Sequence, residues 1–296
     1  MPYFLLILTT LFWSGNFVLS RGMHAAIPPL GLSFWRWLVA LVILATFGLH
    51  HLIAQRQIAR RHLGFLLIQG TLGVAGFNSL VYLAMQTTTA INAVLVNSCI
   101  PVLIAVCSWL LYQDRMTVRQ CLGVVVSLSG VMLIIARGDL HHLLSVDFNR
   151  GDILVLLAAC CWALYSANLK RYPKELHPFA YQVAIVISGL IILTPLYAWE
   201  VASGKTFTLN LATGVTILYV AIFASILAFI FWNTAVRTVG ANKAGPFIHL
   251  MPVFSTILAV IFLDERLYSY HGYGILLICV GIVMTTYRVG RITEAR

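Results

Sequence analysis

Charged side chains are scarce in this sequence. Asp, Glu, Lys and Arg together supply 9% of its 296 residues, while 60% of the residues are hydrophobic and the mean hydropathy is +0.92. A soluble domain has about 25% charged residues. Because so few charges cannot coat a water-facing surface, the composition excludes an ordinary soluble domain and indicates a protein whose solvent is lipid.

Cysteine motifs and catalytic motifs are also missing. The six cysteines lie inside apolar runs without a CxxC pair or a Cys/His ligand spacing, so we expect no disulfide framework, no metal site and no cofactor. The HExxH motif of a zinc protease is absent, as is a pair of membrane-embedded aspartates. Ser14 has no histidine close to it in sequence. We therefore expect no enzyme, and an intramembrane enzyme or a lipid-handling scaffold stays as the alternative of another class.

The sequence is nevertheless basic, with 19 Lys and Arg against 9 Asp and Glu and a formal net charge of +10. In a soluble protein this excess is typical of nucleic-acid binding. Here the basic residues lie in short segments between apolar runs, where they hold loops on the cytoplasmic side. The expected partners are membrane lipid and a small-molecule substrate, without nucleic acid, and the oligomeric state is left open.

Ten apolar runs are long enough to cross a bilayer, which takes about 20 residues of helix. Their continuity does not match the alternating pattern of barrel strands, and backbone groups in lipid must otherwise be paired within a helix. The predicted fold is an all-α membrane protein with ten transmembrane helices, at about 3–20, 31–51, 64–84, 91–112, 119–136, 152–170, 179–199, 211–235, 242–263 and 270–288.

The basic residues also predict the orientation of these helices. With the N-terminus inside, five lie on the outer side and Arg36 lies within a helix. Cytoplasmic loops carry the excess of Lys and Arg, so we expect both termini in the cytoplasm and a multi-pass protein of a bacterial inner membrane. The other 13 are cytoplasmic, namely Arg56, Arg60, Arg61, Arg115, Arg119, Lys170, Arg171, Lys174, Arg237, Lys243, Arg288, Arg291 and Arg296.

The two halves of the chain resemble each other. A shift of 151 residues places 90–103 on 241–254, with Pro101 on Pro252, and a shift of 149 places Trp13 on Trp162. Each half holds five predicted helices, an odd number, so the second copy is inverted in the membrane, as in many transporters. The predicted organisation is a first repeat at 1–137, a connecting loop at 138–151, a second repeat at 152–288 and a cytoplasmic tail at 289–296.

These features resemble the drug/metabolite transporter superfamily, in particular its ten-helix EamA-type branch. The resemblance covers nearly the whole chain and is carried by Trp13, Ser14 and Asn16, by Trp35-Arg36-Trp37, and by two helix-end segments, Gln113-Asp114-Arg115 and Asp264-Glu265-Arg266. Asp114 stands where the family usually has Glu.

The resemblance implies export of small metabolites, by alternating access around a central midplane cavity. Members of the family move amino acids, nucleobase-like compounds, nucleotide-coupled sugars and cationic drugs. The YddG-like exporters, similar in size and repeat layout, release aromatic amino acids, and we take export of amino acids, including aromatic ones, as the expected function. Multidrug or other metabolite efflux is the alternative within the class.

Polar and aromatic residues at mid-depth are the candidate pathway residues, because burying them in lipid costs free energy unless they find partners. They recur three or four residues apart in four of the predicted helices, which places them on single helix faces. Trp13 and Trp162 are too deep for the interfacial aromatic belt, so they either stack on a planar substrate or fill the core. The stripes are Thr9, Trp13, Asn16 and Ser20; Thr71, Ala75, Asn78 and Tyr82; Trp162, Tyr165 and Ser166; and Gly245, His249, Pro252 and Thr256.

Two prolines add backbone groups to this set. Pro101 and Pro252 lie near the middle of predicted helices, and each frees the carbonyl four residues earlier, at Asn97 and Ile248. Ser98 corresponds to His249 under the repeat shift. Freed backbone at mid-depth is tolerated beside protein or a water-filled cavity, so these prolines either shape the substrate pathway or only its packing. His249 either binds substrate or a proton, or is a packed, hydrogen-bonded histidine.

Charge inside the helices is the last clue. We expect Arg36, one and a half turns inside its helix, to reach the headgroups, with binding of a substrate carboxylate as the alternative. No Asp or Glu lies near mid-depth, which argues against a carboxylate proton relay. Facilitated export, or exchange down a gradient, is the expected energetics.

Overall fold

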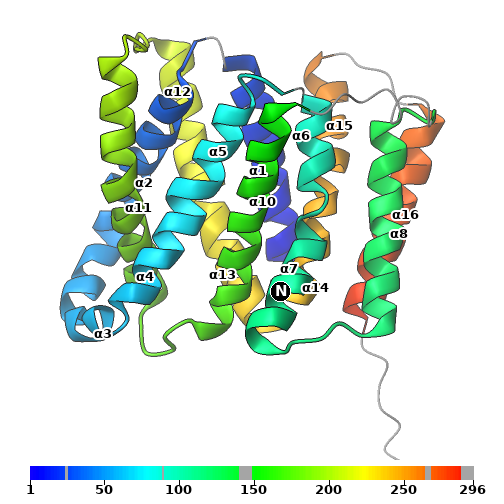
Figure 1. Cartoon of the computed structure of the whole chain (residues 1–296), viewed down its shortest axis with the longest axis horizontal. Helices are drawn as coiled ribbons and strands as arrows, with labels where there is room; N and C mark the ends of the chain where they lie inside the picture. Colours follow the sequence, from blue (N-terminus) through cyan, green and yellow to red (C-terminus); the bar gives the residue numbers. More distant parts are fainter. Residues whose placement is uncertain (24–25, 89, 140–148, 264–267, 288–296) are drawn as a thin grey trace, which may run out of the picture.

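The computed structural model describes residues 1–296 except 24–25, 89, 140–148, 264–267 and 288–296. Every regular element in this described part is helical, as the sequence predicts, and the helices stand side by side as one bundle (Figure 1). In the first half these are α1 (Pro2–Met23), α2 (Pro29–Ala54), α3 (Arg56–Arg61), α4 (Leu63–Gln69), η1 (Gly70–Gly76), α5 (Phe77–Ala84), α6 (Ala90–Asn97), α7 (Ile100–Tyr112) and α8 (Val118–Ile135).

The second half is also helical, and like the first it contains a π-helical stretch. Nine helical stretches in the described ranges are long and apolar enough to cross a membrane. The predicted helix at 242–263 corresponds to α14, η4 and α15 and is not one of these nine. The elements are α10 (Arg150–Asn168), η2 (Leu169–Arg171), α11 (Pro178–Ala202), α12 (Leu211–Tyr219), η3 (Val220–Leu227), α13 (Ala228–Val239), α14 (Ala241–Ala244), η4 (Gly245–His249), α15 (Leu250–Leu263) and α16 (Ser269–Thr286).

Local signals in the sequence set several helix starts. Proline occupies the first turn of α2 and of α11, where its missing N–H costs no hydrogen bond. A capping box closes the N-terminus of α8, where Thr117 accepts from the backbone N–H of Gln120. The N-terminus of α2 is also capped from a distance, because the buried carboxylate of Glu200 accepts the N–H groups of Leu30 and Gly31 at 3.2 and 2.7 Å. This contact joins the start of α2 to the end of α11.

Two membrane helices contain a stretch of π-helix, at η1 and at η3, about 150 residues apart. A π stretch leaves the backbone hydrogen-bond ladder one residue out of step and is frequent at functional sites. Polar side chains compensate in both places. The amide nitrogen of Asn78 donates to the carbonyl of Gly73 at 3.5 Å, and the hydroxyl of Ser225 donates to the carbonyl of Val220 at 2.8 Å.

The helices that contain Pro101 and Pro252 are interrupted just before these prolines. In the first half, α6 ends at Asn97 and α7 begins at Ile100, with Pro101 in its first turn. In the second half, the 3₁₀ turn η4 precedes α15, which contains Pro252. Both interruptions follow from the hydrogen bond that each proline removes from the turn before it.

The helices pack in matching sets. α1 packs on α13 and α15, while α10 packs on α5 and α7; α2 contacts η3, while α11 contacts η1. The pair α8 and α16 lies at one side of the bundle (Figure 1). Their axes come close because glycines face each other, and a Cβ on Gly123 would lie 2.6 Å from the carbonyl oxygen of Gly281.

Candidate functional site

A small cavity lies at the centre of the bundle. Its walls come from α1, α5, α6, α7, α10, α13, η4 and α15, so both halves of the chain contribute. The free space inside is about 30 Å³, the room of about one water molecule. Side chains must therefore separate before a metabolite fits. The lining residues are Trp13, Asn16, Phe17, Phe77, Asn78, Val81, Tyr82, Met85, Asn97, Ile100, Trp162, Phe229, Ile248 and Met251.

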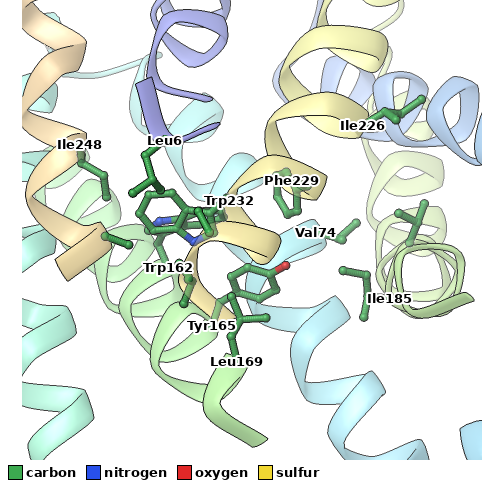
Figure 2. Close-up of a cluster of buried hydrophobic side chains, with 14 of the residues drawn as sticks. Leu6, Val74, Trp162, Tyr165, Leu169, Ile185, Ile226, Phe229, Trp232 and Ile248 are labelled. Carbon is green, nitrogen blue, oxygen red and sulfur yellow. The ribbon is translucent and has the colours of Figure 1, made fainter. Parts of the chain in front are cut away.

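A cluster of aromatic rings contributes to the wall of this central cavity, and Figure 2 shows Trp162, Tyr165, Phe229 and Trp232 of this cluster lying close together. Trp162 is its hub, with its ring centroid 4.9 Å from that of Trp13, 5.4 Å from Phe229 and 5.7 Å from Trp232. Trp13 and Trp162 meet edge to face, an arrangement that the ring quadrupole favours. The indole nitrogen of Trp232 donates to Ser166, and that of Trp13 donates to the carbonyl of Ala224 in η3. These bonds hold two of the three indoles in place.

Two buried polar atoms of the cavity wall have no partner. In the described part of the chain, the indole N–H of Trp162 and the amide oxygen Oδ1 of Asn97 make no hydrogen bond. A buried donor or acceptor without a partner costs about 1–3 kcal/mol, so native proteins rarely keep one without a reason. The residues that carry this donor and this acceptor line a cavity whose other walls are aromatic, aliphatic and amide side chains.

The opposite wall carries a hydrogen-bond network. The hydroxyl of Tyr82 donates to Oδ1 of Asn16 at 3.1 Å. The same hydroxyl accepts a 2.6 Å bond from Arg36, whose Nη1 also donates to Oδ1 of Asn78 at 2.9 Å, and Nε of Arg36 donates to Ser225 at 2.8 Å. The arginine therefore lies directly behind the residues that line the cavity.

The prediction that Arg36 reaches the lipid headgroups was wrong. Its side chain has no exposed surface and bends into the bundle instead of reaching the headgroups. Three neutral acceptors on α5 and η3 accept hydrogen bonds from its Nε and Nη1 atoms, and no Asp or Glu in the described ranges pairs with it. The inward direction of Arg36 could have been inferred from Asn78 and Tyr82, which lie one turn apart in a neighbouring helix and can accept its hydrogen bonds.

A second, larger cavity opens at the end of the bundle where most basic residues lie. Its volume is about 720 Å³, and Lys170, Lys174 and Arg237 line it. Lys170 forms a 2.8 Å salt bridge with Asp114 across its mouth, joining the end of α7 to η2. The pair is about half exposed, so it contributes about 0–1 kcal/mol to stability. We call this space the basic vestibule.

Arg237 and Tyr172 stack in the basic vestibule, with the guanidinium carbon 3.5 Å from the ring centroid. Burial raises the pKa of Tyr172 to about 12, although Arg237 acts in the opposite direction. The phenol is therefore neutral at physiological pH. The net charge of the vestibule is positive, since one carboxylate faces three cations.

Between the vestibule and the central cavity lies a second tyrosine–asparagine pair. The hydroxyl of Tyr165 donates to Oδ1 of Asn233 at 2.7 Å, and the amide of Asn233 donates to Gln182 at 3.2 Å. Tyr165 also touches Trp162, with ring centroids 5.1 Å apart. The repeat shifts of 149 and 151 residues place Asn16 on Tyr165 and Tyr82 on Asn233, so the two pairs occupy equivalent positions with their residue types exchanged.

Six of the predicted pathway residues line the central cavity, and the other five do not. Ser98 and Pro252 line an adjoining small pocket between α6 and α15. His249 is buried and points away from the cavity, where its ring nitrogens contact Ser127 at 2.7 Å and the carbonyl of Ser98 at 3.0 Å. Pro101 contacts the turn at η4 rather than the cavity. The six are Trp13, Asn16, Asn78, Tyr82, Asn97 and Trp162.

The sequence interpretation missed other residues of the site. Phe229 and Trp232 belong to a continuous apolar run, so no pattern separated them from lipid-facing residues. Asn233 is the one polar residue of that stretch to meet Tyr165, and its match to Tyr82 was the available signal. Asp264-Glu265-Arg266 lies outside the described residues. Among the residues searched, no group of three or more His, Cys, Asp or Glu side chains is arranged to hold a metal ion.

A multi-pass helical bundle enclosing a polar and aromatic central cavity defines a membrane transport protein. The comparison with protein families agrees, because the model of the EamA-like transporter family matches residues 1–136 and 149–287. The chain belongs to the EamA-like transporter family. As a member it is a multi-pass integral membrane protein that moves a small molecule.

Known proteins similar to the chain are transporters by name. An uncharacterized transporter of Archaeoglobus fulgidus is 29% identical over 290 residues, which is 96% of each chain. The uncharacterized transporter YyaM of Bacillus subtilis is 26% identical over 87% of this chain and 84% of its own. A solved crystal structure superposes with a TM-score of 0.79 over 96% of each chain at 17% identity, which supports the fold alone.

Proposed function

We propose that this transporter exports amino acids, including aromatic ones, through the central cavity. The carrying observation is the cavity's composition: tryptophan and phenylalanine rings surround one unpaired donor, on Trp162, and one unpaired acceptor, on Asn97. Aromatic rings offer stacking to a planar side chain. The free acceptor suits an ammonium group, and the free donor suits a carboxylate oxygen.

The two cavities support alternating access. The basic vestibule reaches the aromatic cluster from one end, and the collapsed central cavity lies on the other side of that cluster. Movement of the Trp162 cluster and of the Tyr165–Asn233 pair joins the two spaces. In this account ten helices form two inverted repeats, at 1–137 and 152–288, around the midplane site, and the paired contacts of α1 with α13 and of α10 with α5 support that symmetry.

The orientation that we propose puts both termini and the basic vestibule in the cytoplasm of a bacterial inner membrane. The described conformation is then open towards the cytoplasm, ready to load a substrate for export. The basic vestibule attracts molecules that carry a carboxylate. Because no carboxylate lies near mid-depth, the driving force is the substrate gradient rather than a proton relay.

Multidrug efflux is disfavoured by the same charges. A cationic drug is stabilised by a buried carboxylate, whereas this cavity has a buried arginine behind it. An intramembrane enzyme or a scaffold gives no reason for unpaired polar atoms in an aromatic cavity.

The test is uptake of labelled tryptophan and phenylalanine by proteoliposomes, with and without a proton gradient. We expect saturable uptake that empty liposomes lack, that the gradient does not change, and that Trp162→Ala abolishes. Trp199→Ala is the matched control, because Trp199 is 67% exposed on α11. Uptake equal in Trp162→Ala and Trp199→Ala, or absent from folded wild-type protein, contradicts the proposal.

A further inference from the structure

Arg36 is an isolated buried cation. It lies in the middle of the membrane bundle with no exposed surface, and all its observed partners are neutral. A charged side chain at this depth is costly, and in membrane proteins such residues pair with one another or mark a substrate path. The counter-charge is missing from the described part of the chain.

The fold itself does not require this charge. The repeat shift of 149 residues places Arg36 on Ile185, which is also fully buried, on α11. Figure 2 shows Ile185 beside Val74 of η1. The second half therefore packs the equivalent position with an apolar side chain, and the contact between these helices forms without a cation there.

Arg36 also joins the two π-helical stretches. Its Nε donates to Ser225 of η3, and its Nη1 donates to Asn78, which in turn donates to Gly73 of η1. Strained stretches of this kind are frequent where a helix serves function. The arginine therefore connects the cavity wall to the π-helical stretches of both helices.

The geometry of the Tyr82 hydroxyl points to the missing anion. This hydroxyl accepts from Arg36 and donates to Asn16, and both Tyr82 and Asn16 line the cavity. Accepting a bond from a cation makes the O–H a stronger donor. A substrate carboxylate can replace Asn16 as the acceptor of the Tyr82 O–H. The carboxylate then receives a hydrogen bond that the guanidinium of Arg36, bonded to the same hydroxyl, strengthens.

We propose that Arg36 is a specificity-determining residue that restricts the transporter to substrates bearing a carboxylate, bound in the cavity through the hydroxyl of Tyr82. This inference rests on the proposed function and narrows it. The ligand class is the monocarboxylate, amino acids included. The matching amides and amines, which lack the negative charge, are rejected. The partners of the second tyrosine–asparagine pair, Tyr165 and Asn233, within the described residues are neutral, so this pair gives no such selection.

The test is thermal stabilisation of the purified protein by matched ligands. The panel contains tryptophan, tryptophanamide and tryptamine, together with leucine and leucinamide as an aliphatic pair. We expect wild-type protein to bind the carboxylates roughly 10- to 100-fold more tightly than the amides, as a lost hydrogen bond to a charged group predicts. Arg36→Gln loses this preference, Arg36→Lys keeps part of it, and the exposed control Arg60→Gln keeps all of it.

A second variant guards against misfolding. Tyr82→Phe keeps the arginine and removes the donor, so it is expected to lose the carboxylate preference even if Arg36→Gln does not fold. Equal binding of acid and amide by wild-type protein, unchanged preference in either variant, or no stabilisation by any carboxylate overturns the inference. Stabilisation by leucine but not tryptophan leaves the inference standing and removes the aromatic proposal.

Discussion

Asn97 is the residue at which we expect a substitution to raise stability and lower transport at the same time. Its Oδ1 atom is buried beside the central cavity without a partner. Replacement by leucine, of similar shape, removes the unsatisfied acceptor, so we expect Asn97→Leu to stabilise the folded protein by about 1–3 kcal/mol. Because the substrate loses its acceptor, uptake should fall roughly tenfold. Thermal denaturation and uptake of the same preparation measure both effects.

The matched control is Asn92, on the same helix α6. Its amide nitrogen donates to the carboxylate of Asp152 at 2.9 Å. Asn92→Leu is therefore expected to destabilise the protein. If Asn97→Leu also destabilises it, the unpaired oxygen has a structural role and the assignment of Asn97 to the pathway is wrong.

Residue spacing predicted part of this site and could not predict the rest. Trp13, Asn78 and Tyr82 could be predicted because a polar or aromatic stripe in an apolar helix is unusual. The direction of the His249 side chain could not be predicted, because its position on the helix is compatible both with the cavity and with its actual partner, Ser127 on α8. Arg36 was misplaced because sequence spacing gives depth but not whether a long side chain turns inwards.

At the scale of elements, facing glycines determine how closely α8 and α16 pack. A Cβ on Gly123 of α8 would lie 2.6 Å from the carbonyl oxygen of Gly281, and one on Gly281 would lie 2.4 Å from that of Gly123. We expect Gly123→Ala to push α8 from α16 and to cost about 1–3 kcal/mol of stability, as overpacking does. The melting temperature in detergent measures this.

Gly272, on α16 itself, is the control. A Cβ there meets nothing within 4 Å, and alanine is a better helix former than glycine. Gly272→Ala should be neutral or stabilising. A melting temperature that falls equally in both variants would mean that helix propensity or lipid contact, rather than the approach of the two axes, determines stability.

The elements themselves were largely predictable, because apolar runs of about 20 residues leave little choice but helix in lipid. Their interior irregularities were not. The π stretches at η1 and η3 carry local bonds that span five residues, from Asn78 to Gly73 and from Ser225 to Val220, and an apolar sequence pattern does not distinguish such a stretch from α-helix. The interruptions before Pro101 and Pro252 could be predicted, because each proline removes a backbone hydrogen bond to the residue four positions before it.

Charge distribution predicts the topology of the whole molecule. With the basic end in the cytoplasm, the segment 203–210 between α11 and α12 lies outside. In a protein lacking its native cysteines, Ser203→Cys should react with a membrane-impermeant maleimide in intact cells. A cysteine at Arg60, on α3, should react only after the membrane is permeabilised. The opposite labelling pattern would reverse the proposed direction of transport.

The likeness of the two halves is a property of the whole chain with a consequence for selectivity. Both halves place a tyrosine–asparagine hydrogen bond near the tryptophan cluster, and within the described residues an arginine bonds to the tyrosine of the first pair. In the proposed mechanism the two pairs are similar barriers, and the first is the selective position. The repeat shifts match the residues of the two pairs in sequence, but their hydrogen bonds and the contact of Arg36 with Tyr82 required the fold.

Protection of the central cavity by substrate tests the account most directly. Ile100 lines the cavity and is 2% exposed, so Ile100→Cys in a protein without native cysteines reports occupancy through its reaction with a small thiol reagent. Tryptophan at ten times its Kd should slow this reaction roughly tenfold, since about a tenth of the sites are then empty, and should leave Ser203→Cys unaffected. Unchanged labelling of Ile100→Cys under saturating tryptophan, in protein that transports it, would place the pathway elsewhere.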